Sequence, residues 1–292
     1  MEFLSYLISG ISLGSVYAII ALGYTMVYGI AKMLNFAHGD VIMVGGYVAF
    51  ISAQFLGVNG WVAMLIAMIA CTLLGILIEK LAYKPLRTAT SLAVLITAIG
   101  VSYFLQNAAL LIWGASPKVF TPIVEGQLKL FGGQLKISYV TILTVVICII
   151  IAFVLTFFTS KTKLGKAMRA CSEDKGAAQL MGINVNRTIS STFAIGSALA
   201  AVAGVLLLSY SGSLMPTTGS MPGIKAFTAA VFGGIGSIPG AFLGGVLLGV
   251  IESLAKAYIS TQLSNSILFA FLIIVLLVRP SGLLGKYVPE KV

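Results

Sequence analysis

The residues best suited to chemistry in this sequence stand together in the stretch Asn35-Phe36-Ala37-His38-Gly39-Asp40. His38 is the only histidine of the 292 residues, and an imidazole two positions from the Asp40 carboxylate has the composition of an acid–base pair. One hypothesis is therefore an enzyme that works within a membrane. The other acidic residues are few and mostly scattered, and no Gly-x-x-x-x-Gly-Lys-Ser/Thr phosphate loop is present. We expect no catalytic residue, no resident cofactor and no ATP hydrolysis by this chain itself.

Two non-catalytic interpretations of the same stretch remain open. Asp40 could cap the helix that follows, because an aspartate side chain accepts hydrogen bonds from first-turn amides, and the sequence favours this interpretation. The alternative is a substrate pathway lined by polar side chains, which are costly in an apolar segment unless they face protein or water. The candidates for such a pathway are Asn35, His38, Asp40, Gln106 and Asn107. The last two interrupt the apolar segment 92–113, and a hydrogen bond to a neighbouring helix is an equal alternative for them.

The remaining reactive and charged side chains have simpler explanations. Cys71, Cys148 and Cys171 show no Cys-x-x-Cys spacing and no histidine cluster, so the sequence predicts neither a disulfide framework nor a metal site. Glu252 and Lys256 stand four residues apart, which places them on one face of a helix, and we expect them to pair.

The elements that carry these residues are strongly apolar. Hydrophobic residues make up 59% of the chain and charged residues only 9%, a balance that leaves a soluble fold without enough polar surface. About 20 apolar residues cross a bilayer as a helix, and backbone groups in lipid must be satisfied within each segment, so we predict an all-α polytopic membrane protein with about eight or nine transmembrane or half-membrane helices. We expect a single domain over residues 1–292. The apolar segments are residues 5–30, 37–56, 60–79, 92–113, 137–158, 189–210, 225–236, 241–258 and 265–279.

The eighteen basic residues set the expected orientation. They gather between apolar segments, and lysine and arginine concentrate in cytoplasmic loops. We therefore expect residues 80–91, 159–188 and 280–292 in the cytoplasm and residues 114–136 outside. The N-terminus is then outside, as the start of a retained first span. On so apolar a chain, this clustering argues against nucleic acid as a partner despite the net charge of +10.

Residues 159–188 and 280–292 are expected on the same side of the membrane, so an even number of crossings must separate them. Segments 189–210 and 265–279 supply two crossings, and residues 225–258 must therefore form a hairpin. Its turn is expected at Gly236-Ser237-Ile238-Pro239-Gly240. The first arm, about a dozen residues long, is too short to span unaided, which predicts a partial or re-entrant helix. Gly236, Gly240 and Gly244 recur every four residues and would let the backbone approach a neighbouring helix closely. We expect this packing within the chain rather than at a dimer seam.

The longest basic loop, residues 159–188, has the pattern of a docking element. Its middle has the periodicity of a short amphipathic helix, and Gly182 is a natural stop just beyond it. Small residues on one face would let this helix seat in a partner's groove, while a solvated surface helix is the alternative. The residues at helical spacing are Ala167, Ala170, Cys171, Asp174, Ala178 and Met181. The candidates for docking are Arg169, Glu173, Asp174, Ala177, Ala178, Gly182 and Ile183.

Several stretches resemble the permease subunits of branched-chain amino acid ABC transporters, closest to the LivH type. Ala177-Ala178-x-x-x-Gly182 is similar to the "EAA" loop by which ABC importer permeases dock onto their ATPases. The other resembling stretches follow the family's order along the whole chain. They are Ala21-Leu22-Gly23-Tyr24, residues 35–40, Gly165-Lys166-Ala167-Met168-Arg169-Ala170, Phe232-Gly233-Gly234-Ile235-Gly236-Ser237-Ile238-Pro239-Gly240-Ala241 and Arg279-Pro280-Ser281-Gly282-Leu283-Leu284-Gly285.

The resemblance implies import of leucine, isoleucine or valine across the bacterial inner membrane. It implies a second, homologous permease chain, two cytoplasmic ATPase subunits that bind ATP–Mg, and an extracytoplasmic binding protein that delivers the amino acid. One departure concerns docking: Gly176 stands where the EAA loop has its glutamate, while Glu173 and Asp174 lie earlier. A urea or short-amide permease of the same family and a stand-alone secondary transporter remain alternatives.

Overall fold

The computed structural model describes residues 2–130 and 135–285, most of which are helical. The α-helices are α1 (Glu2–Ala31), α2 (His38–Phe55), α3 (Gly60–Ile78), α4 (Ser91–Trp113), α5 (Tyr139–Lys161), α6 (Lys163–Glu173), α7 (Lys175–Leu180), α8 (Val185–Ser211), α9 (Ser220–Gly233), α10 (Ile238–Tyr258) and α11 (Ser264–Val278). A π-helical turn, Glu79–Tyr83, and a 3₁₀ turn, Lys84–Leu86, extend α3. Short strands form two antiparallel pairs, β1 (Lys118–Val119) with β4 (Ser213–Leu214) and β2 (Gln127–Leu130) with β3 (Leu135–Ser138).

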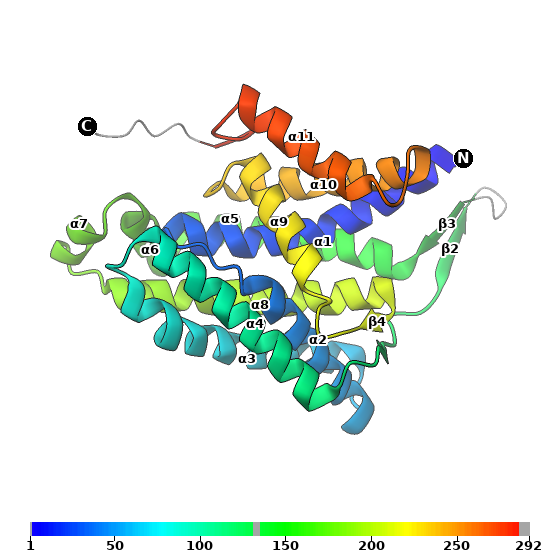
Figure 1. The fold of residues 1–292 in the computed structure, drawn as a ribbon, viewed down its shortest axis with the longest axis horizontal. Coiled ribbons are helices and arrows are strands. Elements are labelled where there is room, and N and C mark those ends of the chain that lie inside the picture. The colour runs from blue at the N-terminus through cyan, green and yellow to red at the C-terminus, as the bar shows by residue number, and fades with distance from the viewer. Residues whose placement is uncertain (1, 131–134, 286–292) are drawn as a thin grey trace.

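Six of these helices are long and apolar enough to cross a bilayer: α1, α3 with its extension, α4, α5, α8 and α10. Figure 1 shows α1, α5, α8 and α10 running along the long axis of the molecule and α9 lying across it. α9 has 14 residues and α11 has 15, which is too short for a bilayer core at a rise of 1.5 Å per residue. The predicted fold class, an all-α polytopic membrane protein that includes partial helices, is confirmed.

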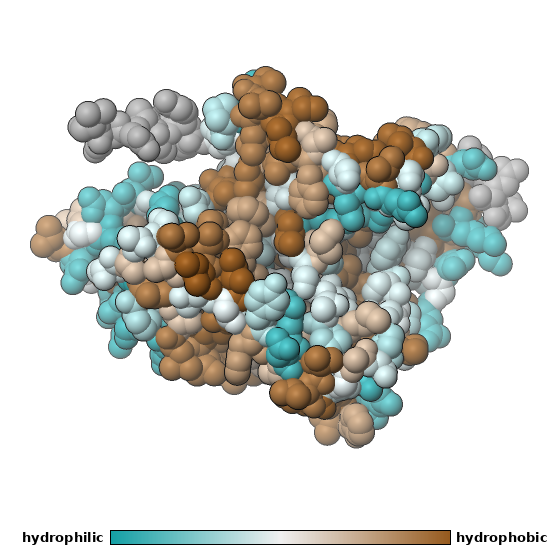
Figure 2. All heavy atoms as spheres, viewed as in Figure 1, coloured by the Kyte–Doolittle hydropathy of each residue, from teal (hydrophilic) through white to brown (hydrophobic). Residues whose placement is uncertain are grey.

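Two of the basic segments lie together at one end of the bundle, which we call the basic end. Arg87 hydrogen-bonds Asn186, and the Lys175 Nζ donates to the carbonyl of Ala31 across 2.8 Å. The opposite end carries the start of α1 and the β2–β3 hairpin (Figure 1). In Figure 2 polar residues gather mainly at these two ends, and apolar residues cover most of the surface between them. A bundle whose sides face lipid and whose ends face water has this distribution.

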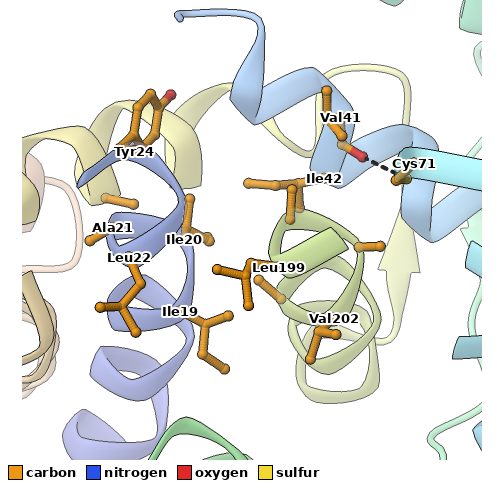
Figure 3. Packing of buried hydrophobic residues seen from close by; sticks show 14 of the residues in the cluster. Ile19, Ile20, Ala21, Leu22, Tyr24, Val41, Ile42, Cys71, Leu199 and Val202 are labelled. Carbon is orange, nitrogen blue, oxygen red and sulfur yellow. Dashed lines mark hydrogen bonds between the residues drawn. The ribbon is translucent and has the colours of Figure 1, made fainter. Parts of the chain in front are cut away.

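Small residues let the central helices approach closely. Figure 3 shows Ile20 of α1 and Leu199 of α8 filling the space between their helices, with Ile42 of α2 beside them. On the other side of α1, a Cβ atom added at Gly14 would lie 2.7 Å from the Cα of Val246 in α10, so this crossing requires glycine. The glycine-rich faces therefore pack within the chain, as the sequence predicted.

The turn between α9 and α10 differs in detail from the prediction. It lies at residues 234–237, and Pro239 falls in the first turn of α10, where its missing amide costs no helical hydrogen bond. Gly236 precedes the helix with a φ of +95°, a conformation that glycine adopts without strain. The prediction that Gly236 belongs to a continuous glycine stripe is therefore wrong, because its role is in the turn.

The stripe on α10 begins instead at Gly240. A Cβ at Gly240 would lie 3.0 Å from the carbonyl carbon of Gly233 in α9, and a Cβ at Gly244 would lie 3.0 Å from the Gly233 nitrogen. The two arms of the hairpin therefore touch along Gly240 and Gly244, with backbone against backbone.

Candidate functional site

α2 begins inside the bundle instead of at its basic end. The chain turns back after Ala31 at Lys32, which has a φ of +57°, and passes into the bundle before the helix starts. The His38 ring then lies 4.6 Å, between centroids, from the ring of Tyr24, about two turns before the end of α1. The second apolar segment, expected over residues 37–56, therefore starts within the bundle.

The N-terminus of α9 meets the N-terminus of α2. A Cβ at Gly39 would lie 2.6 Å from the carbonyl oxygen of Gly219, and a Cβ at Gly223 would lie 2.8 Å from the Cα of Gly39. Only glycine permits backbones to approach this closely. Two partial helices thus start beside each other within the membrane-spanning part of the chain.

Asp40 does not cap α2. The residue before the helix is Ala37, which makes no side-chain cap, and Asp40 lies inside the first helical turn. Its Oδ1 accepts a hydrogen bond of 2.9 Å from the Nε2 of Gln106 on α4. The cap interpretation is therefore wrong, because a neighbouring helix supplies the donor that the helix's own amides were expected to supply.

Gln106 connects three helices at this point. Besides Asp40 on α2, its Nε2 lies 3.2 Å from the hydroxyl of Ser102 on α4 and 3.2 Å from that of Ser220 in the first turn of α9. These four polar side chains meet between α2, α4 and α9. The sequence placed Asp40 and Gln106 among the pathway candidates but missed Ser102 and Ser220, which carry no local signal.

The four polar groups line an open groove of about 570 Å³. Its remaining walls are aromatic and aliphatic: Tyr24, Phe36, Leu95, Ile99, Tyr103 and Ile224. Asp40 itself is 1% exposed. Among the described residues no lysine, arginine or histidine nitrogen lies within 4.0 Å of its carboxylate. In Figure 2 a polar group interrupts the apolar surface near α4 and the start of α9.

The other pathway candidates do not line this groove. The Oδ1 of Asn35 accepts a 2.8 Å hydrogen bond from the Tyr83 hydroxyl, which holds the turn before α2 in place. Asn107 on α4 is exposed, is not part of the groove lining and donates to the carbonyl of Tyr103. His38 is buried, and its Nε2 has no hydrogen-bond partner in the described part of the chain.

The arrangement offers no acid–base machinery of the kind considered above. His38 packs against Tyr24, whereas the hydrogen bond of Asp40 goes to Gln106. Gly10-Ile11-Ser12-Leu13-Gly14 matches the spacing of a nucleophile elbow, but Ser12 is buried in the middle of α1 instead of on a sharp turn. Within residues 2–130 and 135–285, no three His, Cys, Asp or Glu side chains gather as a metal site.

The basic loop forms two helices at the basic end, not the single helix that was expected. Asp174 ends α6 and caps α7, its side chain accepting a 2.9 Å hydrogen bond from the amide of Ala177. α7 stops at Leu180, and Gly182 follows with a φ of +80°, as the predicted stop requires. After α7, the amide of Ile183 donates to the Ala178 carbonyl across 3.0 Å. We call these two helices and the residues up to Ile183 the α6–α7 unit.

Part of the small-residue face of helices α6 and α7 is covered by the chain itself. Met168, Cys171 and Ala178 are buried in a small apolar cluster that also contains Met26 and Ile30 of α1. For Cys171 and Ala178 the expectation of seating in a partner is corrected, because the chain itself covers them, whereas Asp174 and Met181 of the same predicted face are exposed. The docking candidates that are exposed are Arg169, whose guanidinium donates to the Ser160 carbonyl, and Glu173, Asp174, Ala177 and Gly182; Leu180 and Met181 beside them are exposed as well.

Burial shifts the pKa values of Cys171 and Lys175, which join helices α6 and α7 to the bundle. It raises the pKa of the Cys171 thiol. It lowers the pKa of the Lys175 ammonium, an effect that the neighbouring charges of Arg87 and Lys32 reinforce. Lys175 nevertheless reaches the last carbonyl of α1, at Ala31, where a cation is favoured by the helix dipole.

Two further charged clusters are buried. Glu252 on α10 is 2.6 Å from Lys256, as predicted, but it also binds Lys225 of α9 at 2.7 Å, a partner that the sequence analysis missed. Near the basic end, Glu79 pairs with Arg87 and accepts a hydrogen bond from Ser190. A charged residue inside an apolar segment, such as Lys225, was the available signal for a buried partner.

Known proteins similar to this chain are transport permeases. A family model described as the permease component of branched-chain amino acid transport systems matches residues 6–278. The high-affinity branched-chain amino acid transport system permease protein BraD of Pseudomonas aeruginosa is 47% identical over 100% of this chain and 98% of its own length. For the protein LivH of Escherichia coli K12, which has the same description, the identity is 45% with the same shares. A probable branched-chain amino acid transport permease of Methanocaldococcus jannaschii is 30% identical, over 91% of this chain and 88% of its own. The chain therefore belongs to the family of branched-chain amino acid transport system permease components.

Proposed function

We propose that this chain is a permease subunit of an ABC importer that carries branched-chain amino acids across the bacterial inner membrane. The similarity to permeases of that description runs over the full length of the chain. The relatives bear the names of transport proteins and not of enzymes, and the six apolar spans supply the multi-pass membrane fold that transport needs. The chain holds no cofactor of its own in this proposal.

The observation that carries the proposal is the apolar tip of the α6–α7 unit. Leu180 is 90% exposed and Met181 is 82% exposed, at the end of the bundle where the basic residues gather. Large apolar side chains on a water-facing surface mark a site of protein contact, whereas exposed apolar residues on the sides of the bundle face lipid. The tip, Leu180 and Met181, is thus the part of this chain that binds a cytoplasmic ATPase.

The remaining partners complete the transport cycle. Two ATPase subunits bind ATP–Mg and move the tips of the permease pair, and the second permease is a homologous chain. An extracytoplasmic binding protein delivers the amino acid at the opposite end, near the β2–β3 hairpin. The basic end faces the cytoplasm, as its lysine and arginine content favours.

Uptake of radiolabelled leucine tests the proposal directly. The chain is co-expressed with its second permease, ATPase and binding-protein subunits in cells that lack leucine uptake, and ATP-dependent accumulation is expected. Truncating the tip in the variant Leu180→Ala/Met181→Ala removes apolar contacts worth about 1.5–3 kcal/mol per buried side chain, so retention of the ATPase on purified permease should fall at least about tenfold.

Leu111 provides the matched control for the tip. It is 87% exposed but lies on the side of α4, so Leu111→Ala should leave ATPase retention and uptake unchanged. Accumulation of urea instead of leucine would favour the short-amide alternative. Leucine uptake that persists without the ATPase subunits would point to a secondary transporter and overturn the proposal.

A further inference from the structure

The groove between α2, α4 and α9 contains a carboxylate that lacks a counter-ion. The two other deeply buried acids of the described chain are paired, Glu252 with Lys225 and Glu79 with Arg87. Asp40 is equally buried, yet it meets only neutral donors and lines an open cavity. A lone charge inside a membrane protein is expensive and is retained where it has a ligand or a pathway to serve.

We propose that Asp40 is the binding site for the α-ammonium group of the amino acid as it crosses the membrane. The assignment rests on the proposed function and adds the group of the substrate that this chain recognises. An ammonium group has three donors and a positive charge, which match the acceptor oxygens of a carboxylate. Ser220 and Ser102 bring hydroxyl oxygens to the same place as further acceptors.

The walls of the groove fit the rest of such a ligand. Phe36, Leu95, Ile99 and Ile224 place apolar surface around the polar group. The volume of about 570 Å³ lies within the range of about 300–1,000 Å³ of pockets that hold small molecules. An ammonium group beside Asp40 would therefore leave an aliphatic side chain in contact with aliphatic walls.

A purely structural role for Asp40 makes a different prediction. The hydrogen bond from the Gln106 amide needs an oxygen acceptor but no negative charge, and asparagine would supply that oxygen. The variant Asp40→Asn therefore removes the charge and keeps the contact between α2 and α4. A structural residue tolerates this change, whereas an ammonium site does not.

The charge of the groove can be measured without transport. In membranes that hold the complete importer, the variant S220C is modified with methanethiosulfonates that carry either an ammonium or a sulfonate group. The parent chain gives the background, since Cys71, Cys148 and Cys171 are all buried. We expect the cationic reagent to react faster, and the ratio of the two rates to fall at least about tenfold when Asp40→Asn is added, since a unit charge a few ångströms away acts strongly where little water screens it.

The variant N107C is the matched control, because Asn107 lies next to Gln106 but outside the groove. Its rate ratio should not change with Asp40→Asn. An unreactive S220C, or a rate ratio at S220C that is the same with and without the Asp40 charge, would overturn the proposal, because the groove would then be closed to water or uncharged.

Uptake supplies the second arm. Asp40→Asn should lower leucine uptake at least about tenfold while the ATPase activity stimulated by loaded binding protein stays within about twofold, and Asp40→Glu should retain more uptake than Asp40→Asn. Wild-type uptake by Asp40→Asn would refute the assignment. If the unmodified importer moves no leucine while the charge ratio at S220C still depends on Asp40, the proposed substrate fails but the cation-binding groove stands.

Discussion

The buried cluster around Glu252 permits a quantitative test of how α9 is held in the bundle. Glu252 is buried; its carboxylate accepts hydrogen bonds from the Tyr17 hydroxyl at 2.9 Å and the Lys225 Nζ at 2.7 Å, and it forms an ion pair with the Lys256 Nζ at 2.6 Å. These contacts join α1, α9 and α10. Because Ser220 is also on α9, the cluster fixes the helix that forms one wall of the groove.

Replacing Glu252 by alanine leaves one buried ammonium group without a partner. Lys225 is 6% exposed, and breaking a buried ion pair by removing one partner costs about 3–5 kcal/mol. The pair with Lys256 adds little, because 41% of that side chain is exposed and solvent screens it. At about 2–4 °C per kcal/mol, the expected fall in melting temperature of Glu252→Ala is about 6–20 °C.

The assay is thermal unfolding of the detergent-solubilised permease, followed by fluorescence-detected size-exclusion chromatography. The double variant Glu252→Leu/Lys225→Met removes both charges and should recover more than half of the loss, since replacing a buried pair by apolar residues is often close to neutral. A melting temperature of Glu252→Ala within about 2 °C of wild type would refute the reasoning, and so would a double variant no more stable than the single one.

Three further predictions address packing, burial and coupling. Gly249→Ala places a Cβ against the backbone of α1 at Gly14 and should lower the stability of the permease, followed by its melting temperature, by about 1–3 kcal/mol. A Cβ at position 100 would have no atom within 4 Å, so Gly100→Ala should leave the stability unchanged or raise it by about 0.5–1 kcal/mol. Because burial raises the pKa of Cys171, its thiolate fraction near pH 8 is below that of a free cysteine; a membrane-permeant maleimide should label it slowly and faster as pH rises, while the exposed variant E173C reacts at once. Lys175→Met removes the hydrogen bond to the Ala31 carbonyl and should lower leucine uptake several-fold while ATP hydrolysis is retained. Equal uptake by the variant and the wild type would contradict a coupling role for Lys175.

The features that the sequence predicted well depend on local composition. An apolar run of about 20 residues is helical in lipid whatever its neighbours are, which is why the six spans and the short first arm of the α9–α10 hairpin were predictable. The pairing of Glu252 with Lys256 also follows from spacing along one helix. Gly182 ended its helix as expected, because a positive φ at that position is a local requirement.

The features that were missed depend on which segments meet in space. A capping role for Asp40 was the better local interpretation, but Gln106, sixty-six positions away, is the actual donor. The predicted face that contains Ala178 was assigned to one continuous helix, but Asp174 divides it between α6 and α7, and periodicity does not say whether a partner or the same chain covers Ala178. The sequence analysis gave Lys225 no partner, and only the fold brings it to Glu252.

The same contacts suggest how the two ends of the molecule communicate. The α6–α7 unit holds the last carbonyl of α1 through Lys175, and the turn that follows is held by the hydrogen bond between Asn35 and Tyr83. That turn leads directly into the first turn of α2, which carries Asp40. In the proposed function, a partner that pulls on the tip would therefore act on a segment that leads directly to Asp40. Because α2 and α9 meet by glycine-to-glycine backbone contact, with no large interlocking side chains at Gly39 and Gly219, they can slide past each other at lower cost than the interdigitated core around Ile20.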